Sequence, residues 1–265
     1  METRNPIDLL THKRFDVVIK YLYASNLSSG FFKNAYKEHL GIWNGFTEDK
    51  RKKSTFEDFD NSFISMINNK VDEPVPVNPE GHLANGAHRL AAALYRQRPI
   101  NIRSTTKKEN YPIEADYKVF LRKGLQKHIL GRTALEYAKL KPNTHVICLF
   151  PIAHTRMDEV MNIIEKHSNI FYTSSEGLTA PGQIGLIKEI YLSEGWVSEK
   201  GIRKKCQQCF RGMAQVTFVL IDAKNLETVK EMKKEIRALF KVGNHSVHIN
   251  DYHVDTVRIA KTVFN

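Results

Sequence analysis

The chain has 265 residues, 42% of them hydrophobic, and a formal net charge of +11 at pH 7. This length and composition predict a globular protein large enough for two lobes. We find no apolar run near the roughly 18 residues of a membrane span and no signal-peptide core, so we expect a cytoplasmic protein without a membrane span. The excess of Lys and Arg attracts polyanions, which keeps nucleic acid among the possible partners.

Residues 1–53 are expected to form an N-terminal helical lobe. Most of residues 5–48 have a helical pattern, and aromatic side chains stand there among lysines. Such side chains are more often part of a core than a stacking platform for bases.

A second helix is expected from about residue 54. Ser54 and Glu57 have the spacing of a capping box at its start. Its apolar face is predicted from side chains at helical spacing, which are Phe56, Phe59, Phe63, Ile64 and Ile67. A short apolar strand at 74–78 and a turn at 79–81 follow.

The most informative segment is 82–98, where a short strand turns through Gly86 into an Ala-rich helix, before another strand at 99–102. Glycine lets the backbone approach a ligand closely, and the first N–H groups and the dipole of the helix favour an anion. His88 and Arg89 add donors at the same end. The turn therefore predicts phosphate binding, although the pair could instead cap the helix or meet a surface carboxylate.

Residues 54–103 resemble the ParB/sulfiredoxin superfamily, especially its small-metabolite kinases such as the free-serine kinases. The resemblance rests on the Glu-bearing helix start, the Pro-Val-Pro-Val strand and the Gly-x-His-Arg turn. It implies a nucleotide-binding unit in which Glu57 is the base toward a substrate hydroxyl. The implied phosphate-binding residues are Asn85, Gly86, Ala87, His88 and Arg89. Those kinases usually have an acidic residue where Asn85 stands, and sulfiredoxins have cysteine where Ala87 stands.

Phosphoryl transfer requires positioning and charge neutralisation, which a helix N-terminus, an arginine and a metal ion supply. With Glu57, His88 and Arg89 as catalytic residues, we expect a nucleotide-dependent phosphotransferase that uses ATP and Mg²⁺ on the hydroxyl of a small metabolite or saccharide. Other carboxylates could replace Glu57 as the base, and these are Asp58, Asp60, Asp72 and Glu73. The alternatives are a nucleic-acid-binding protein or nuclease, and a nucleotide sensor without turnover.

Residues 104–144 are polar and are expected to bridge two halves, with a helix near 132–139. Residues 145–265 then alternate between strand and helix patterns, which predicts a C-terminal α/β domain. Strands are expected at 145–150, 170–173, 215–222 and 246–249. Helices are expected at 156–166, 182–194, 226–240 and 252–264. The whole chain is thus predicted to be α/β (α+β).

A second candidate site lies at 243–253, around the last strand and the start of the last helix. Its expected members are His245, His248, Asn250 and Asp251, which could face a metal, a nucleotide or a substrate. The alternative is that Asn250 or Asp251 only caps the helix. This terminal segment and the phrase at 183–191 also resemble uncharacterised proteins of bacterial surface-polysaccharide loci, which implies a sugar, polyol or sugar phosphate as the acceptor.

Cys206 and Cys209 could join His245 and His248 in a four-ligand zinc site. The segment has a helical, very basic pattern without the glycine common beside zinc knuckles, so we expect two cysteines on a helix face instead. Cys148 lies in an apolar run and is expected to be buried.

Overall fold

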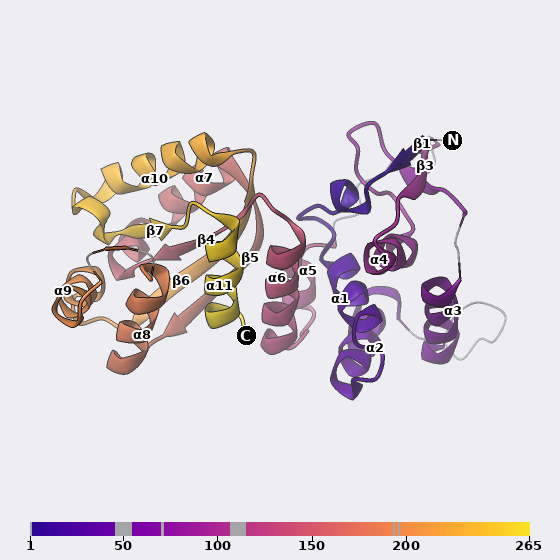
Figure 1. Ribbon diagram of the computed structural model, residues 1–265, viewed down its shortest axis with the longest axis horizontal. Helices are drawn as coiled ribbons and strands as arrows, with labels where there is room; N and C mark the ends of the chain where they lie inside the picture. Colours follow the sequence, from indigo (N-terminus) through magenta and orange to yellow (C-terminus); the bar gives the residue numbers. More distant parts are fainter. Residues whose placement is uncertain (1, 46–54, 70–71, 107–114, 193, 196) are drawn as a thin grey trace. The chain divides into compact units, whose positions relative to one another are not determined.

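The computed structural model describes residues 2–45, 55–69, 72–106, 115–192, 194–195 and 197–265. They form two compact units, Met1–Glu136 and Tyr137–Asn265. Helix α6 (Lys127–Leu140) runs across the boundary between them. Each unit combines helices with a sheet, which confirms the predicted α/β (α+β) class (Figure 1). Within the described ranges, none of the helices is long and apolar enough to cross a membrane.

The N-terminal unit is mostly helical and contains one small sheet. Its elements before α6 are β1 (Glu2–Arg4), the 3-10 helix η1 (Pro6–Leu9), α1 (Phe15–Ala24), α2 (Gly30–Asn44), α3 (Phe56–Asn68), β2 (Val75–Val77), α4 (Ala87–Arg96), β3 (Ile100–Ser104) and α5 (Tyr117–Arg122). Strand β3 pairs parallel with β2 and antiparallel with β1. Helix α4 therefore forms the crossover of a β2–α4–β3 unit. The order of strand, helix and strand agrees with the prediction, but the short strand expected directly before Gly86 is only an isolated bridge between Leu83 and Val77. Strand β1 and helix α5 were not anticipated.

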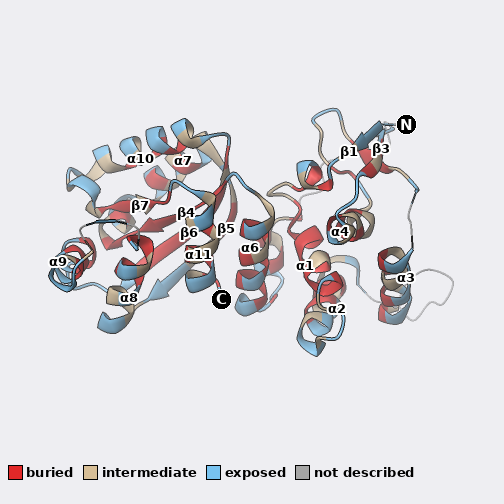
Figure 2. Cartoon of the chain, viewed as in Figure 1, coloured by how far each residue is buried: buried red, intermediate tan, exposed pale blue. Residues whose placement is uncertain are grey.

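Aromatic side chains contribute much of the core of this unit, in agreement with the sequence analysis. Figure 2 shows buried residues along α1. Tyr23 and Tyr36 are buried, and their rings stack with centroids 4.8 Å apart. Phe63 from α3 packs beside both rings. Phe31, by contrast, is 41% exposed.

The start of α3 differs from the predicted capping box. Thr55 is the N-cap, and its hydroxyl oxygen accepts a hydrogen bond from the backbone N–H of Asp58. Ser54 lies outside the described residues. The cap is therefore one residue later than predicted, and Glu57 is not its acidic partner.

The C-terminal unit contains a four-stranded sheet. Its elements after α6 are β4 (Thr144–Leu149), η2 (Pro151–Arg156), α7 (Met157–His167), β5 (Ser168–Gly177), α8 (Ala180–Ile190), α9 (Glu199–Phe210), β6 (Gln215–Ala223), α10 (Leu226–Phe240), η3 (Gly243–His245), β7 (Val247–Ile249) and α11 (His253–Val263). The strand order is β5-β6-β4-β7, and every neighbouring pair is antiparallel. Two interleaved units, β4–α7–β5 and β6–α10–β7, give the connectivity of a split βαβ, or ferredoxin-like, motif.

Helices cover both faces of this sheet (Figure 1). Helices α7 and α10 pack on one face, where the core includes Ile147, Val219 and Ile249. Helices α8 and α11 lie on the other face. Burial on both faces explains why β6 is an almost continuous apolar run. The short strand β7 forms one edge of the sheet.

Candidate functional site

Gly86 begins helix α4 in a conformation that favours glycine. Its φ is +94°, and a Cβ atom built there would lie only 2.7 Å from Cγ1 of the buried Val75. The missing side chain therefore lets α4 pack closely on β2. Close packing is a sufficient reason for glycine at this position, so a bound ligand is not needed to explain it. The N-terminus of α4 has no side-chain cap.

The two donors of this turn are engaged by the protein itself. The Arg89 guanidinium donates to the carbonyl oxygen of Pro74 at 3.0 Å and forms an ion pair with Glu73 at 3.1 Å. The Nε2 atom of His88 shares a hydrogen bond with the Tyr36 hydroxyl at 2.8 Å. Both side chains thus fasten α4 to neighbouring elements.

The carboxylates considered as the base have different surroundings. Glu57 is exposed on the first turn of α3, and Asp58 accepts a hydrogen bond from the Thr55 hydroxyl. Asp60 is buried, where it accepts from Tyr23 at 2.6 Å and pairs with Lys33. None of these contacts identifies a base.

The cavity beside α4 is small, at about 160 Å³. Asp72, Arg89, Arg96 and Arg98 are among the residues that line it. Small-molecule sites usually enclose ~300–1,000 Å³. Phosphate binding by Asn85, Gly86, Ala87, His88 and Arg89 therefore stays a prediction.

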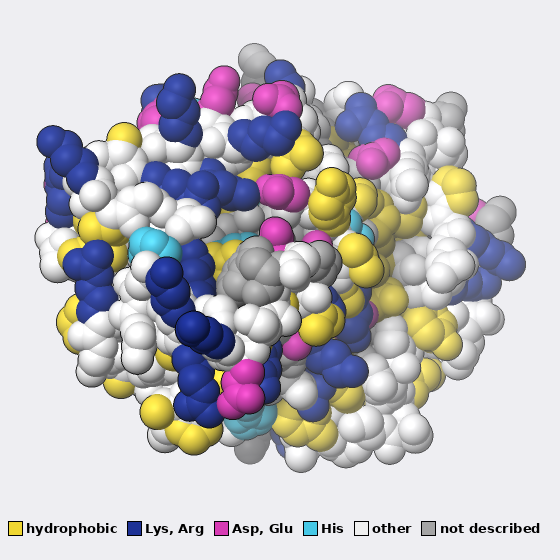
Figure 3. Space-filling view, turned by 60° about the vertical axis from the view of Figure 1, so that its left-hand side comes forward, with side chains coloured by type: hydrophobic (Ala, Val, Ile, Leu, Met, Phe, Trp, Pro, Cys, Tyr) yellow, Lys and Arg dark blue, Asp and Glu magenta, His cyan; other side chains and the backbone are white. Residues whose placement is uncertain are grey.

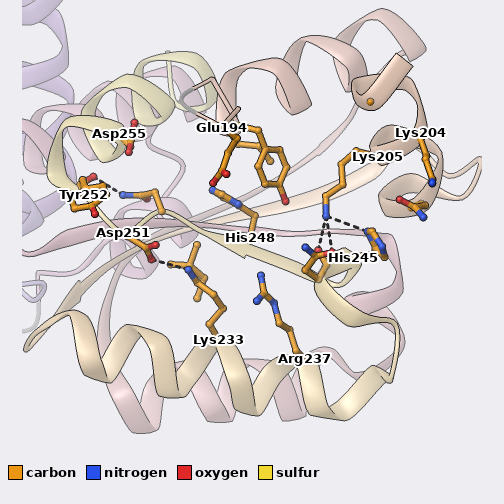
Figure 4. Close-up of a pocket in the computed structure, with 17 residues that line it drawn as sticks. Glu194, Lys204, Lys205, Lys233, Arg237, His245, His248, Asp251, Tyr252 and Asp255 are labelled. Atoms are coloured by element: carbon orange, nitrogen blue, oxygen red, sulfur yellow. Dashed lines mark hydrogen bonds and ion pairs between the residues drawn. The ribbon is translucent and has the colours of Figure 1, made fainter. Parts of the chain in front are cut away.

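A larger cavity lies in the C-terminal unit, beside edge strand β7 (Figure 4). We call it the β7 pocket. It measures about 450 Å³ and is lined by Ile190, Tyr191, Glu194, Gly201, Lys204, Lys205, Gln208, Lys233, Arg237, Asn244, His245, His248, Ile249, Asn250, Asp251, Tyr252 and Asp255. All four residues of the second predicted site are among them.

Two helices supply most of the cations of this pocket. Lys233 and Arg237 are four residues apart on α10, so both project from one side of that helix. On α9, the lining residues Gly201, Lys204 and Lys205 likewise follow helical spacing. From the sequence, these lysines and this arginine were counted only toward the net positive charge. Their helical spacing could have placed them together on helix faces.

Lys205 is 7% exposed and contacts neutral atoms. Its Nζ donates to the Asn244 carbonyl oxygen at 3.0 Å and to Asn244 Oδ1 at 2.9 Å, and lies 3.2 Å from His245 Nδ1. An ammonium has no acceptor, so Nδ1 accepts here, and a neutral His245 carries its proton on Nε2. Burial lowers the pKa of Lys205, because desolvation disfavours the charged form.

Two buried nitrogen atoms in this pocket have no hydrogen-bond partner among the described residues. They are Nε of Arg237 and Nε2 of His248. The Arg237 side chain also forms no ion pair within the described part of the chain. Burial lowers the pKa of His248 to about 3, and the nearby charge of Lys233 adds to the effect, so the ring is neutral at physiological pH.

The carboxylates of the pocket are largely neutralised by other side chains. Asp251 pairs with Lys233 at 2.8 Å, and Asp255 pairs with Arg258 at 2.7 Å. Figure 4 shows these two carboxylates at one end of the pocket and Lys205 at the other, with Arg237 between them. The pocket is therefore divided by charge, and its positive end lacks counterions among the described residues.

Asn250 has a structural role rather than a free functional group. Its Oδ1 accepts from the Val146 N–H at 2.7 Å, and its Nδ2 donates to the Tyr252 carbonyl and the Thr256 hydroxyl. Tyr252, not Asn250 or Asp251, is the N-cap residue of α11, so the capping alternative is wrong. His253 contacts the Ala138 carbonyl oxygen and does not line the pocket.

The cysteines behave as helix-face residues. Cys206 and Cys209 are both buried on α9, but the Cys206 thiol faces Gln183 while Cys209 lies 3.9 Å from His245 Nδ1. Burial raises the pKa of Cys209 to about 12. The described residues contain no group of three candidate metal ligands. Cys148 is buried, as predicted.

Comparison with known proteins gives no relative: no family model, no curated protein and no solved structure matches the chain. The resemblance of residues 54–103 to the ParB/sulfiredoxin superfamily therefore stays a prediction.

Proposed function

We propose that the chain is a phosphotransferase whose phosphate-bearing substrate binds in the β7 pocket. The observation that supports this best is the Arg237 side chain, which is only partly exposed, lines the pocket and has no ion-pair partner among the described residues. Leaving a charge partly desolvated and unpaired costs free energy. An anionic ligand would offset this cost, and arginine matches the geometry of phosphate oxygens.

The rest of the pocket supports the same type of ligand. Lys204 adds positive charge at the end of the pocket where no described carboxylate is paired with it. The volume of about 450 Å³ suits a small molecule rather than a bare ion. A phosphate on such a molecule would lie near Arg237, where the surplus positive charge is concentrated.

The chemistry of transfer would use the same groups. The oxygen of an acceptor hydroxyl bonds to phosphorus while the bond to the leaving group breaks, and cations stabilise the charge on the transferring group. Glu194 is an exposed carboxylate on the pocket wall that could accept the hydroxyl proton. If ATP and Mg²⁺ are used, as the sequence suggests, the ion would be held by substrate phosphates together with one or two carboxylates.

Isothermal titration calorimetry with inorganic phosphate, ADP and ATP, with and without Mg²⁺, tests the site. We expect Arg237→Ala to weaken binding about 10–100-fold, because a hydrogen bond to a charged group contributes ~1.5–3 kcal/mol. Lys234→Ala is the matched control, since Lys234 is exposed on the same helix and does not line the pocket. ATP consumption in the presence of hydroxylated acceptors then tests turnover.

Equal affinities for the wild type and Arg237→Ala would contradict the proposal. A loss of affinity in Arg89→Ala instead would move the phosphate site to the Gly86 turn. Binding that Arg237→Ala abolishes, without turnover on any acceptor, would support a nucleotide or phosphate sensor.

The exposed side of α9 favours a second candidate, nucleic-acid binding. Lys200, Arg203 and Lys204 line an open groove on this helix, and Figure 3 shows Lys and Arg side chains gathered on one face of the molecule. Such a face attracts phosphate backbones in a salt-dependent way. Fluorescence anisotropy with single-stranded and duplex oligonucleotides at low salt tests this, with Lys200→Glu/Arg203→Glu as the variant. If neither oligonucleotide binds, the candidate is excluded.

A further inference from the structure

Lys205 is a primary amine in an unusual position for a lysine. Its side chain is almost fully buried, yet it lines the β7 pocket. Buried ammonium groups are normally paired with carboxylates. No described carboxylate lies within ion-pair distance of Lys205, so no ion pair within the described residues stabilises its charged form.

A base lies within reach of this amine. The His245 Nδ1 atom is 3.2 Å from Nζ, and Figure 4 shows the Lys205 amine directed toward His245. A nucleophile and a base within hydrogen-bond distance form the arrangement that activates side chains for covalent chemistry. Desolvation lowers the pKa of Lys205 most, Cys209 opposes this effect, and the positive charge of Arg237 adds to it, so the net direction is toward the neutral amine.

Lys204 shows what is special about its neighbour. It lines the same pocket, but its side chain is exposed and no hydrogen bond or ion pair is found for it among the described residues. An exposed amine stays hydrated, so desolvation does not activate it. The two adjacent lysines thus provide an internal comparison between a buried and an exposed amine.

We propose that Lys205 forms an imine with a phosphorylated aldehyde or ketone held in the β7 pocket. This rests on the phosphate binding of the proposed function and goes beyond phosphoryl transfer. The amine nitrogen bonds to the carbonyl carbon, and the carbonyl oxygen leaves as water. Overall, an ammonium and a carbonyl compound give a protonated imine and water, so no oxidant or reductant is required. His245 accepts a proton from the ammonium so that the amine can attack.

Pyridoxal 5′-phosphate is the probe, because it joins an aldehyde to a phosphate. The full chain is incubated with it near neutral pH, reduced with borohydride to fix any imine, digested and analysed by mass spectrometry. We expect Lys205 to be the one modified residue. Its rate of labelling should exceed that of Lys204 by about tenfold or more, in line with the reactivity of desolvated lysines. Pyridoxal, which lacks the phosphate, should label Lys205 much more slowly.

Variants separate the parts of the argument. His245→Gln should slow labelling of Lys205, because glutamine can accept a hydrogen bond but cannot take up the proton. Arg237→Ala should raise the concentration of pyridoxal 5′-phosphate needed for half-maximal labelling, whereas Lys234→Ala should not. Excess inorganic phosphate should protect Lys205.

Label on Lys204, or spread over surface lysines with Lys205 unmodified, would overturn the inference. If inorganic phosphate binds in an Arg237-dependent way but Lys205 does not react, the imine is excluded while the proposed function stands. If no phosphate compound binds and Lys205 is not labelled, both fail. Equal rates of Lys205 labelling by pyridoxal and pyridoxal 5′-phosphate would contradict the part of the inference in which the pocket recognises the phosphate group.

Discussion

The Gly86 turn and the β7 pocket carry similar side chains, but the protein uses them differently. At the turn, Arg89 is satisfied by Glu73 and by backbone carbonyl oxygens. In the pocket, Arg237 has a buried Nε without a partner among the described residues. A cation whose bonds are already made within the fold stabilises the fold, whereas an unsatisfied one is available to a ligand.

The two histidines differ in the same way. His88 shares a hydrogen bond with Tyr36 and lies among the aromatic rings of the N-terminal core. The Nε2 atom of His248 is sealed from solvent in the β7 pocket and finds no partner in the described ranges. Residue type alone therefore does not separate a structural histidine from a candidate functional one.

The largest effect is expected from Gly86→Ala. The new Cβ would meet Val75 Cγ1 at 2.7 Å, and the residue would have to keep a φ of +94°. Backbone strain and overpacking together predict a loss of about 2–5 kcal/mol in the free energy of unfolding. Thermal and urea denaturation measure this loss.

Gly124→Ala is the control, because Gly124 also has a positive φ of +88°, but a Cβ atom placed there would have no neighbouring atom within 4 Å among the described residues. Gly124→Ala should lower the free energy of unfolding by only about 1–2 kcal/mol, because backbone strain at the positive φ is its one cost. If both variants were equally stable, close packing of α4 on β2 would not be the reason for the glycine.

Local sequence patterns predicted most of the helices and strands. The helical spacing of Phe56 and Phe63 and the apolar run of β6 gave the right element types. Strand β1 was missed because three residues, two of them charged, have no readable alternation. Its structure depends on pairing with β3, which is distant in the sequence.

The candidate site was predictable in part. His245, His248 and Asp251 lie close together in the sequence, so their clustering around β7 was visible. Lys205 and Arg237 come from α9 and α10, and only the order of strands in the antiparallel sheet brings these helices to the same edge. Sequence also could not show that Arg89 is occupied, because its partners are backbone atoms and a carboxylate sixteen residues away.

The next largest effect concerns pH. The pKa of His248 is about 3 in the folded chain, below its ordinary value. The unfolded chain thus takes up a proton near pH 6.5 that the folded chain refuses until about pH 3. The stabilisation is complete above pH 6.5 and is lost progressively as the pH falls toward 3.

Between about pH 7.5 and pH 4.5, the free energy of unfolding should therefore fall by about 2–3 kcal/mol less in His248→Gln than in the wild type. Urea denaturation at both pH values measures the difference. Buried His39 also has a lowered pKa and contributes to acid sensitivity in both proteins, so only the difference between them is informative. His128→Gln is the control, because His128 is exposed.

Arg89→Ala tests the satisfied side of the comparison. Removing the guanidinium deletes its hydrogen bonds to the Glu73 and Pro74 carbonyl oxygens, which predicts a loss of about 1–2 kcal/mol in stability. Phosphate affinity should stay unchanged if the β7 pocket is the binding site. Unchanged stability together with lost nucleotide affinity would reverse the roles of the two regions.

Arg237→Met gives the smallest change in stability and the sharpest contrast. Methionine fills similar apolar space without a charge, and removing an unpaired, partly buried charge costs little or even stabilises the fold. We expect the free energy of unfolding to stay within about 0.5 kcal/mol of the wild-type value, or to rise. In the same thermal denaturation experiments, the stabilisation that phosphate gives the wild type should disappear. If the free energy of unfolding of the ligand-free variant is more than about 1 kcal/mol below the wild-type value, then Arg237 makes stabilising contacts within the fold, as Arg89 does. Removing a cation lowers stability by that much only when its hydrogen bonds contribute to the fold.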